Sequence, residues 1–410
     1  MHQASGPAVP VYGLAALASL ITAMILLFPE ASFSASLAGL QLWLDVVFPA
    51  LLPFFVMAEI MMGLGVVHFI GVLLEPFMRP LFRIPGAGAF AVAIGLAAGY
   101  PLGAKVAGDL RRAQLCTGPE GERLVSLANT ADPLFLAGAV AVGMFALPEL
   151  AGPLALGHYL GVISVGLLMR FHAPRGPASR DPHTAEPVLL RALAALRAAR
   201  QRDGRPLGEL FGDAVRNSMN TLLFVGGSIV MFSVILEVLS IAGVVGIAGQ
   251  LLAAALEPLN VHPTVADALI RGGMEITIGA KAASLAAAPL LDKAVAASAI
   301  IAWSGLSVHA QVAVMVHRTD IRLAPYIAAR CLHALLAAGF TWLILGPLQG
   351  WVDVGALPVL APWWAAQSLT FGARLFHATA TAAQLALGML GVVGVGAALG
   401  RLAVFWTRVR

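Results

Sequence analysis

The chain has 410 residues, of which 59% are hydrophobic and only 11% are charged. A soluble domain carries about 25% charged residues, so this chain has too little charge to cover a water-exposed surface of its size. Long runs of Ala, Leu and Val indicate transmembrane helices rather than a β-barrel. The two cysteines lie far apart without metal-ligand spacing, and we expect no metal site and no cofactor.

Eight apolar runs approach or exceed the roughly 20 residues that cross a bilayer. They fall at 11–28, 39–65, 120–145, 154–170, 216–245, 290–315, 323–345 and 376–406. The first run has no Lys or Arg before it and a long apolar core, so we interpret it as a retained span and not a signal peptide. Two further segments, 86–112 and 264–287, contain enough Gly and Pro to interrupt a helix, which predicts two re-entrant hairpins.

Arginines set the expected orientation. The segment 170–205 holds eight of them, and the positive-inside rule favours a cytoplasmic loop over a nucleic-acid-binding arm. Arginines also flank the first hairpin and follow the last apolar run. The segment 346–372 contains three tryptophans and no Lys or Arg, which predicts an external loop. Both termini are therefore expected in the cytoplasm.

The two halves of the chain resemble each other. Glu59 in FVMAEI has a counterpart in Glu237 of SVILEV, and Gly103-Ala104-Lys105 recurs as Gly279-Ala280-Lys281 at nearly the same offset. Three spans per copy is an odd number, so the second copy must be inverted. The predicted fold is an all-α polytopic membrane protein with about eight transmembrane helices, two re-entrant hairpins and inverted-topology repeats, an arrangement typical of secondary transporters.

This repeat divides the chain into five expected parts. They are an N-terminal transmembrane helix (1–38), the first repeat (39–170), a cytoplasmic Arg-rich loop (171–206), the second repeat (207–346), and an external loop with a C-terminal helix (347–410).

The first hairpin is predicted to turn at Gly99-Tyr100 and to restart at Pro101, since proline suits the first helical position. The new helix would point its free amides and positive dipole into the membrane. Lys105 follows one turn later, and amides beside an ammonium group favour an anion. In the second copy we expect Gly272-Gly273 to break the helix.

Thr277 is then expected to cap the restarted helix, with Lys281 at the position of Lys105. The alternative is that both lysines reach the interface or pair with Glu59 and Glu237 to stabilise the fold. Their recurrence at symmetric breaks favours a buried, functional role.

A third kind of break is predicted inside spans, at Asn129-Thr130-Ala131-Asp132-Pro133 and at its counterpart beginning Ser304-Gly305. The residue before proline avoids the helical region, and exposed backbone at membrane depth must line a cavity. These polar residues are candidates for contacts with substrate or ion, with helix–helix hydrogen bonding as the alternative.

The predicted site follows from these breaks. The substrate-binding candidates are Gly99, Tyr100, Pro101, Gly103, Lys105, Asn129, Thr130, Asp132, Thr277, Gly279, Lys281, Ser304 and Ser307. The candidates for ion coupling, to H+ or Na+, are Glu59, Glu237, Glu275 and Arg271. A structural pairing of Glu59 and Glu237 fits equally well. We expect structural roles for His68, His158, His333, Glu75 and Glu257, and a packed neutral ring is the first interpretation of His309.

Several motifs together resemble a known family. They are the segments 48–55 (FPALLPFF), 65–76, 99–105 (GYPLGAK), 122–126 and 129–133 (NTADP). This pattern, dense over about 40–145 and fainter over 210–345, looks like the YlbJ-type (SpoVV) sporulation integral membrane proteins. That resemblance implies a nucleoside-recognition (Gate) domain, similarity to concentrative nucleoside transporters, and transport of dipicolinate toward the forespore across the outer forespore membrane of a spore-forming bacterium.

The expected function is a secondary transporter of a small organic anion. Its expected partners are that anion and membrane lipid, and no nucleic acid is expected. The sequence leaves open whether the protein forms a homo-oligomer. An ion-coupled nucleoside or other solute transporter is the first alternative, and a non-transporting scaffold of sporulation is the second. An enzyme is not expected, because His-Glu-x-x-His and Gly-x-Ser-x-Gly motifs are absent from the sequence.

Overall fold

The computed structural model describes residues 8–179 and 186–348, and this part of the chain is helical without strands. Within these described ranges, five helical segments are long and apolar enough to cross a membrane: 29–63, 148–169, 207–241, 290–315 and 323–345. They correspond to five predicted spans, although the first begins ten residues earlier than residue 39. The predicted span 11–28 corresponds to the helix α1 (Ala8–Leu27). The predicted span 120–145 is divided into two shorter helical elements, Gly118–Ala128 and Phe135–Met144, and the span 376–406 lies outside the described residues.

The described elements repeat in the same order. The first series is α1 (Ala8–Leu27), α2 (Pro29–Leu42), η1 (Trp43–Val47), α3 (Phe48–Gly63), α4 (Val66–Phe77), η2 (Met78–Phe82), α5 (Gly88–Ala98), α6 (Leu102–Arg112), α7 (Gly118–Ala128), η3 (Phe135–Met144), η4 (Pro148–Leu150) and α8 (Ala151–Met169). After α9 (Val188–Asp203) come α10 (Leu207–Ile241), α11 (Val244–Leu256), η5 (Glu257–Leu259), α12 (Val265–Met274), α13 (Ile276–Leu285), α14 (Leu290–Trp303), α15 (Gly305–Met315) and α16 (Leu323–Leu345).

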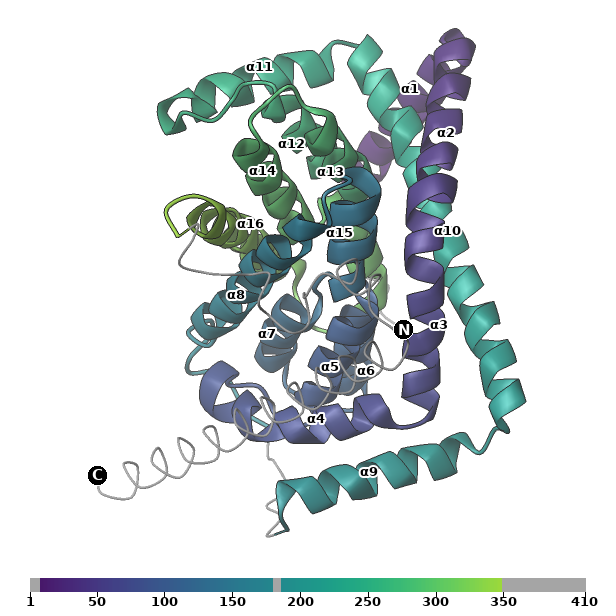
Figure 1. The fold of residues 1–410 in the computed structure, drawn as a ribbon, viewed down its shortest axis with the longest axis vertical. Helices are drawn as coiled ribbons and strands as arrows, with labels where there is room; N and C mark the ends of the chain where they lie inside the picture. The colour runs from purple at the N-terminus through teal and green to yellow at the C-terminus, as the bar shows by residue number, and fades with distance from the viewer. Residues whose placement is uncertain (1–7, 180–185, 349–410) are drawn as a thin grey trace, which may run out of the picture.

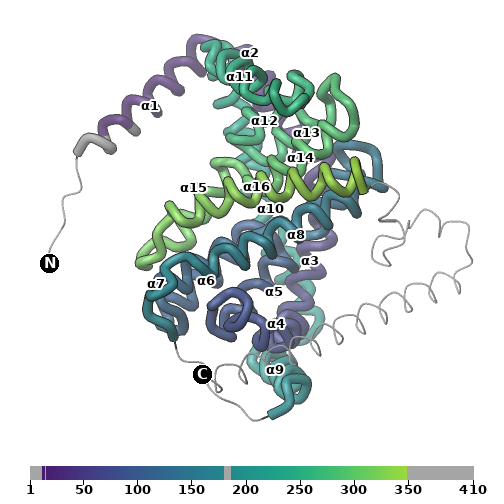
Figure 2. The backbone as a smooth tube through the Cα atoms, turned by 90° about the vertical axis from the view of Figure 1, so that its left-hand side faces the viewer, coloured from purple at the N-terminus to yellow at the C-terminus, as the bar shows by residue number. Residues whose placement is uncertain are grey.

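The second series runs in the opposite direction to the first, as predicted. In Figure 1, α3 descends to the transverse helix α4 at the bottom, whereas α10 ascends to the transverse helix α11 at the top. Figure 2 also shows α11 and α4 at opposite ends of the molecule, with α9 beside α4. Gly65 and Gly243 form the two equivalent corners with φ of 85° and 77°, values that glycine adopts without strain.

The first series contains two helix interruptions where the sequence predicts them. α5 and α6 are separated by Gly99–Pro101, and Gly99 has φ 66°. α7 ends at Ala128 and the next helical turn begins at Phe135. A β-carbon on Gly99 would lie 2.5 Å from Oδ2 of Asp132. The missing side chain therefore lets the second interruption approach the first.

The second series is interrupted at Glu275 and at Ser304. The break expected at Gly272-Gly273 is wrong by two residues, because Gly272 stays helical and packs against Ile300, where a β-carbon would lie 2.5 Å from Cγ1. The cap expected from Thr277 is also wrong. Glu275 caps α13 instead, since its Oε2 accepts a hydrogen bond from the Ile278 amide at 2.8 Å.

Candidate functional site

A cavity of about 70 Å3 lies where the interruptions of both series meet. Its polar lining comes from Tyr100, Asp132, Ser228, Glu275, Thr277, Ser307 and Gln311. Its apolar lining comes from Val47, Leu51, Phe55, Phe135, Val225, Ile276 and Val308. We call this the central cavity. The structure thus brings together five of the predicted site residues, namely Tyr100, Asp132, Glu275, Thr277 and Ser307.

Two buried carboxylates face the central cavity, one from each series. Asp132 is 5% exposed, and its Oδ1 accepts hydrogen bonds from the amides of Leu134 and Phe135 at 3.0 and 2.8 Å. Glu275 is 3% exposed and caps α13. Both carboxylates therefore bind the amides that a helix start leaves without intrahelical partners.

Tyr100 connects the two series at the wall of the central cavity. Its hydroxyl donates a hydrogen bond at 3.0 Å to the carbonyl of Ile301, at the end of α14. Ser307, in the first turn of α15, is buried, and its hydroxyl makes no hydrogen bond with the described residues. The cavity wall thus contains a buried hydroxyl without a hydrogen-bond partner among the described residues.

The sequence interpretation missed a buried arginine behind this wall. Arg330 of α16 is 0% exposed and lies close to Tyr100. Its Nη1 and Nη2 donate to the carbonyls of Asn129 and Ser126 at 2.9 and 2.6 Å. These carbonyls belong to the interrupted end of α7, where the negative end of the helix dipole favours a cation.

Asn129 and Thr130 do not line the central cavity but hold the interruption after α7 in place. The Asn129 amide donates to the hydroxyl of Tyr326 at 2.8 Å, and Thr130 Oγ1 lies 2.8 Å from Nε2 of His158. The amide of Ala131 also donates to that Nε2, at 3.3 Å. A backbone amide can only donate, so Nε2 is the acceptor and His158 is neutral with its proton on Nδ1.

The other buried histidines have structural contacts, as expected. Nε2 of His333 donates to the carbonyl of His158 at 2.9 Å, and the two rings lie 4.5 Å apart. His309 donates from Nδ1 to the carbonyl of Gly305 at 2.8 Å and packs on Trp303. Ser304 is buried at the interruption itself and does not line the cavity.

The predicted burial of Lys105 is wrong. Its side chain is 52% exposed and pairs with Asp109, with 3.1 Å between Nζ and Oδ2. The buried face of α6 consists of Gly103, Ala104, Ala107 and Gly108, so Lys105 points away from it. Lys281 is half-buried, and neither lysine lines the central cavity.

The predicted glycines serve packing. Gly103 lies against the backbone of Ala128, and Gly279 lies against Gly272 within the second hairpin. Pro101 is the residue that precedes α6. Gly103, Gly279 and Pro101 all lie outside the lining of the central cavity.

The remaining coupling candidates also lie away from the central cavity. Arg271 pairs with Asp267 at 2.7 Å on the surface of α12. Glu59 accepts a hydrogen bond from the amide of Asn217 at 3.4 Å, and Glu237 is half-buried in α10. Glu75, for which a structural role is expected, pairs with Arg191 of α9.

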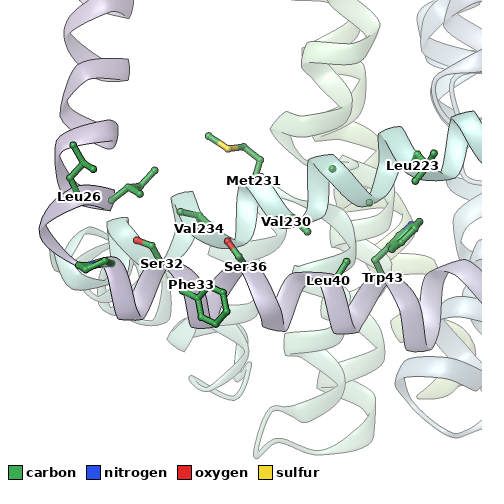
Figure 3. Close-up of a pocket in the computed structure, with 14 residues that line it drawn as sticks. Leu26, Ser32, Phe33, Ser36, Leu40, Trp43, Leu223, Val230, Met231 and Val234 are labelled. Atoms are coloured by element: carbon green, nitrogen blue, oxygen red, sulfur yellow. The ribbon is translucent and has the colours of Figure 1, made fainter.

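A larger groove of about 740 Å3 lies between α1, α2 and α10, and Figure 3 shows its lining. Among the described residues no charged side chain lines it, and Ser32 and Ser36 supply its hydroxyls. It contains none of the helix interruptions, so its size does not make it the candidate site.

Sequence reasoning also missed Ser228 and Gln311, which line the central cavity from α10 and α15. A usable signal was present, because both are polar residues within apolar runs. The apolar lining from α3, including Phe55, carries no such signal.

Comparisons with known proteins bear on the family and on the fold. A family model described as nucleoside recognition (Gate) matches residues 44–180. The chain is 44% identical over 336 residues to the sporulation integral membrane protein YlbJ of Bacillus subtilis (strain 168), covering 81% of this chain and 82% of the relative. It is similar to CNTnw in an inward-facing substrate-bound state, with a TM-score of 0.51, 16% identity, and coverage of 82% of this chain and 87% of that chain. At this identity the likeness shows the fold alone.

Proposed function

The chain belongs to the family of YlbJ-type sporulation integral membrane proteins, and from this premise we propose that it is a secondary transporter of a small organic anion. We propose dipicolinate (pyridine-2,6-dicarboxylate) as the substrate, moving from the mother cell toward the forespore across the outer forespore membrane. Both termini would face the cytoplasm, and the α5–α6 and α12–α13 pairs would be re-entrant hairpins.

One observation carries this proposal: helix interruptions from both inverted series meet at the central cavity. Irregular backbone at membrane depth is tolerated where it is buried in protein or lines a cavity. Transporters with inverted repeats bind their solutes between such broken helices. The fold likeness to CNTnw supports the same reading.

The helix starts around the central cavity support a substrate with carboxylates. Helix N-termini bind anions through free amides and the positive end of the dipole, and two of them hold Asp132 and Glu275. α6 and α15 also begin beside the cavity, and neither has a side-chain cap. These two helix starts, with the Ser307 hydroxyl, offer donors to a dicarboxylate.

The two carboxylates make cation coupling part of the proposal. An anion in the central cavity would lie close to Asp132 and Glu275, where the Coulomb repulsion between unit charges is strong. A proton on either carboxylate, or a Na+ ion between them, reduces this repulsion by cancelling one of the two negative charges. We therefore assign Asp132 and Glu275 to coupling. The cavity of about 70 Å3 must also widen, since ligand pockets measure about 300–1,000 Å3.

A nucleoside or another ion-coupled solute is the second candidate. The match to a nucleoside-recognition model favours it, and Thr277, Glu275 and Gln311 could exchange hydrogen bonds with sugar hydroxyls. A non-transporting scaffold of sporulation is the third candidate, and it predicts no solute flux.

Uptake into proteoliposomes tests these candidates. Labelled dipicolinate, other dicarboxylates and nucleosides would be offered with and without proton and sodium gradients. We expect dipicolinate uptake that depends on one gradient, and we expect Glu275→Gln or Asp132→Asn to remove that dependence. Glu149→Gln is the matched control, because Glu149 is exposed at η4. Uptake of nucleosides without anions would favour the second candidate, and absence of all uptake would contradict transport.

A further inference from the structure

A row of cavities leads from the central cavity to the end of the molecule that carries α4 and α9. Phe55 lines both the central cavity and a narrow space of about 20 Å3 beside Glu59, Leu102 and Thr221. Glu59 and Leu102 also line a groove of about 560 Å3 between α3 and the α5–α6 hairpin. We call this groove the vestibule. Each space shares lining residues with the next, so the three spaces lie in a row and the shared side chains stand between them.

The vestibule contains Lys105, the lysine that the central cavity lacks. Lys105 and Asp109 both line it, and Asp109 also accepts a hydrogen bond from Arg112 at 2.7 Å. When Lys105 leaves Asp109, that carboxylate keeps its pairing with Arg112. The ammonium group is therefore free to bind a carboxylate that enters the vestibule, at little electrostatic cost.

Further charges surround the narrow end of the vestibule. A polar pocket of about 340 Å3 adjoins it through Glu59 and Met62, and is lined by His68, Arg202 and Arg205. Arg205 pairs with Asp203 and Asp213. Both arginines line the adjoining pocket, whereas Lys105 is the basic residue in the lining of the vestibule itself. Glu59 lines both the vestibule and the narrow space.

We propose that this row of cavities is the solute pathway between the central cavity and the α4/α9 end, which the positive-inside rule predicts to be cytoplasmic. In the structure Phe55 and Leu102 close the pathway, and Lys105 is the first binding point for a carboxylate anion. The choice of a carboxylate rests on the proposed function, whereas the pathway rests on the shared lining residues.

Thiol accessibility tests the attraction for anions without any transport assay. In a chain with Cys116→Ala and Cys331→Ala, Met62→Cys would be exposed to negatively and positively charged methanethiosulfonates in inside-out vesicles. We expect the negative reagent to be favoured, and the ratio of the two rates to fall several-fold with Lys105→Gln. Lys281→Gln, at the repeat-related position, should leave the ratio unchanged. An unchanged ratio with Lys105→Gln would overturn the role of Lys105.

Closure by Phe55 has its own test. Ser307→Cys in the same background places a thiol in the central cavity, and we expect Phe55→Ala to raise its reaction rate with these reagents about tenfold. The neighbouring Phe54→Ala is the control, since Phe54 is 39% exposed and lines neither space. Equal rates in the Phe55→Ala and Phe54→Ala variants would overturn this pathway.

Transport kinetics then test whether Lys105 binds a carboxylate of the substrate. We expect Lys105→Gln to raise the KM for dipicolinate about three- to tenfold at low ionic strength, with a smaller change at high salt, and Lys105→Arg to restore the wild-type KM. Equal KM values in wild type and Lys105→Gln would contradict the binding role. If the wild-type protein moves no anion, the proposed function fails, while the two thiol assays still decide whether the pathway exists and favours anions.

Discussion

Arg330 shows how one side chain supplies the hydrogen-bond donors that an interrupted helix lacks. A guanidinium group stays charged in proteins, and a buried charge requires partners. Arg330 finds them in the carbonyls of Ser126 and Asn129, which the end of α7 leaves unpaired. The side chain also lies 5.6 Å from the ring centroid of Tyr326, a further favourable contact for a cation.

Arg330→Gln should therefore destabilise the protein strongly. Two buried carbonyls lose their donors, at about 1–3 kcal/mol each. Thermal unfolding in detergent, followed by a thiol-reactive dye or by light scattering, would measure the loss. The exposed Arg216→Gln is the control, because Arg216 lies on α10 with a side chain that is 74% exposed. A melting temperature equal to that of the control would refute the role of Arg330.

An ion pair joins the two series at the α4/α9 end. Arg111 donates from Nε and Nη2 to the two carboxylate oxygens of Asp320 at 2.6 and 2.9 Å. These hydrogen bonds hold the pKa of Asp320 below its usual value. Since the folded pKa is lowered, the stabilisation is present above the unfolded pKa of about 3.9 and is lost as pH falls through the folded value.

Asp320→Asn should lower stability by about 0.5 kcal/mol at pH 7, because the Asp320 side chain is 58% exposed and solvent weakens the pair. The difference from wild type should be constant between pH 5 and 8 and should shrink below about pH 4. Melting temperatures across this range would show it. A difference that grew on acidification would have the wrong sign for this mechanism.

Among the elements, the α5–α6 hairpin is shaped by glycine contacts. Gly95 and Gly103 both face the carbonyl of Ala128, and a β-carbon on either would overlap that oxygen. The two hairpin helices therefore approach the interrupted end of α7 directly through their backbones. This contact sets the position of Tyr100 in the wall of the central cavity.

Gly95→Ala or Gly103→Ala should reduce substrate uptake by at least tenfold and lower the melting temperature by several degrees. Gly273→Ala, in the other hairpin, is the matched control, because a β-carbon there meets no atom within 4 Å. Proteoliposome uptake and thermal unfolding would measure both effects. If the three variants behave alike, close packing at Ala128 has no importance for the site.

Across the whole molecule, the two series depend on each other. Tyr100 of the first series bonds to Ile301 of the second, and Arg330 of the second bonds to Asn129 of the first. Each series thus donates a hydrogen bond to a carbonyl at a broken helix of the other. Neither half is expected to hold its interruptions in place alone.

Separate expression of residues 1–186 and 187–410 should therefore yield unstable halves, whereas co-expression should give a complex that co-purifies through a tag on one half. The physical reason is that each half alone leaves buried carbonyls without donors. Co-purification should weaken with Arg330→Gln and persist with Arg216→Gln. Two halves that are each stable alone would contradict this interdependence.

Local patterns determined much of this protein. Apolar runs, arginines and an odd number of spans per copy predicted the helical membrane fold and its inversion, because hydropathy and topology act segment by segment. Proline and glycine placed the interruptions near Gly99, Asp132 and Ser304, because they restrict or free the backbone where they occur. Motifs over residues 40–145 were enough to predict the family.

Only the tertiary structure decided which side chains meet. Lys105 faces away because small residues on the other face of α6 pack against α7. Gly272 remains helical because Ile300 fills the space beside it. Arg330 enters the site region from about 200 residues beyond Asn129. Such contacts depend on helix rotation and on distant partners, which no local pattern records.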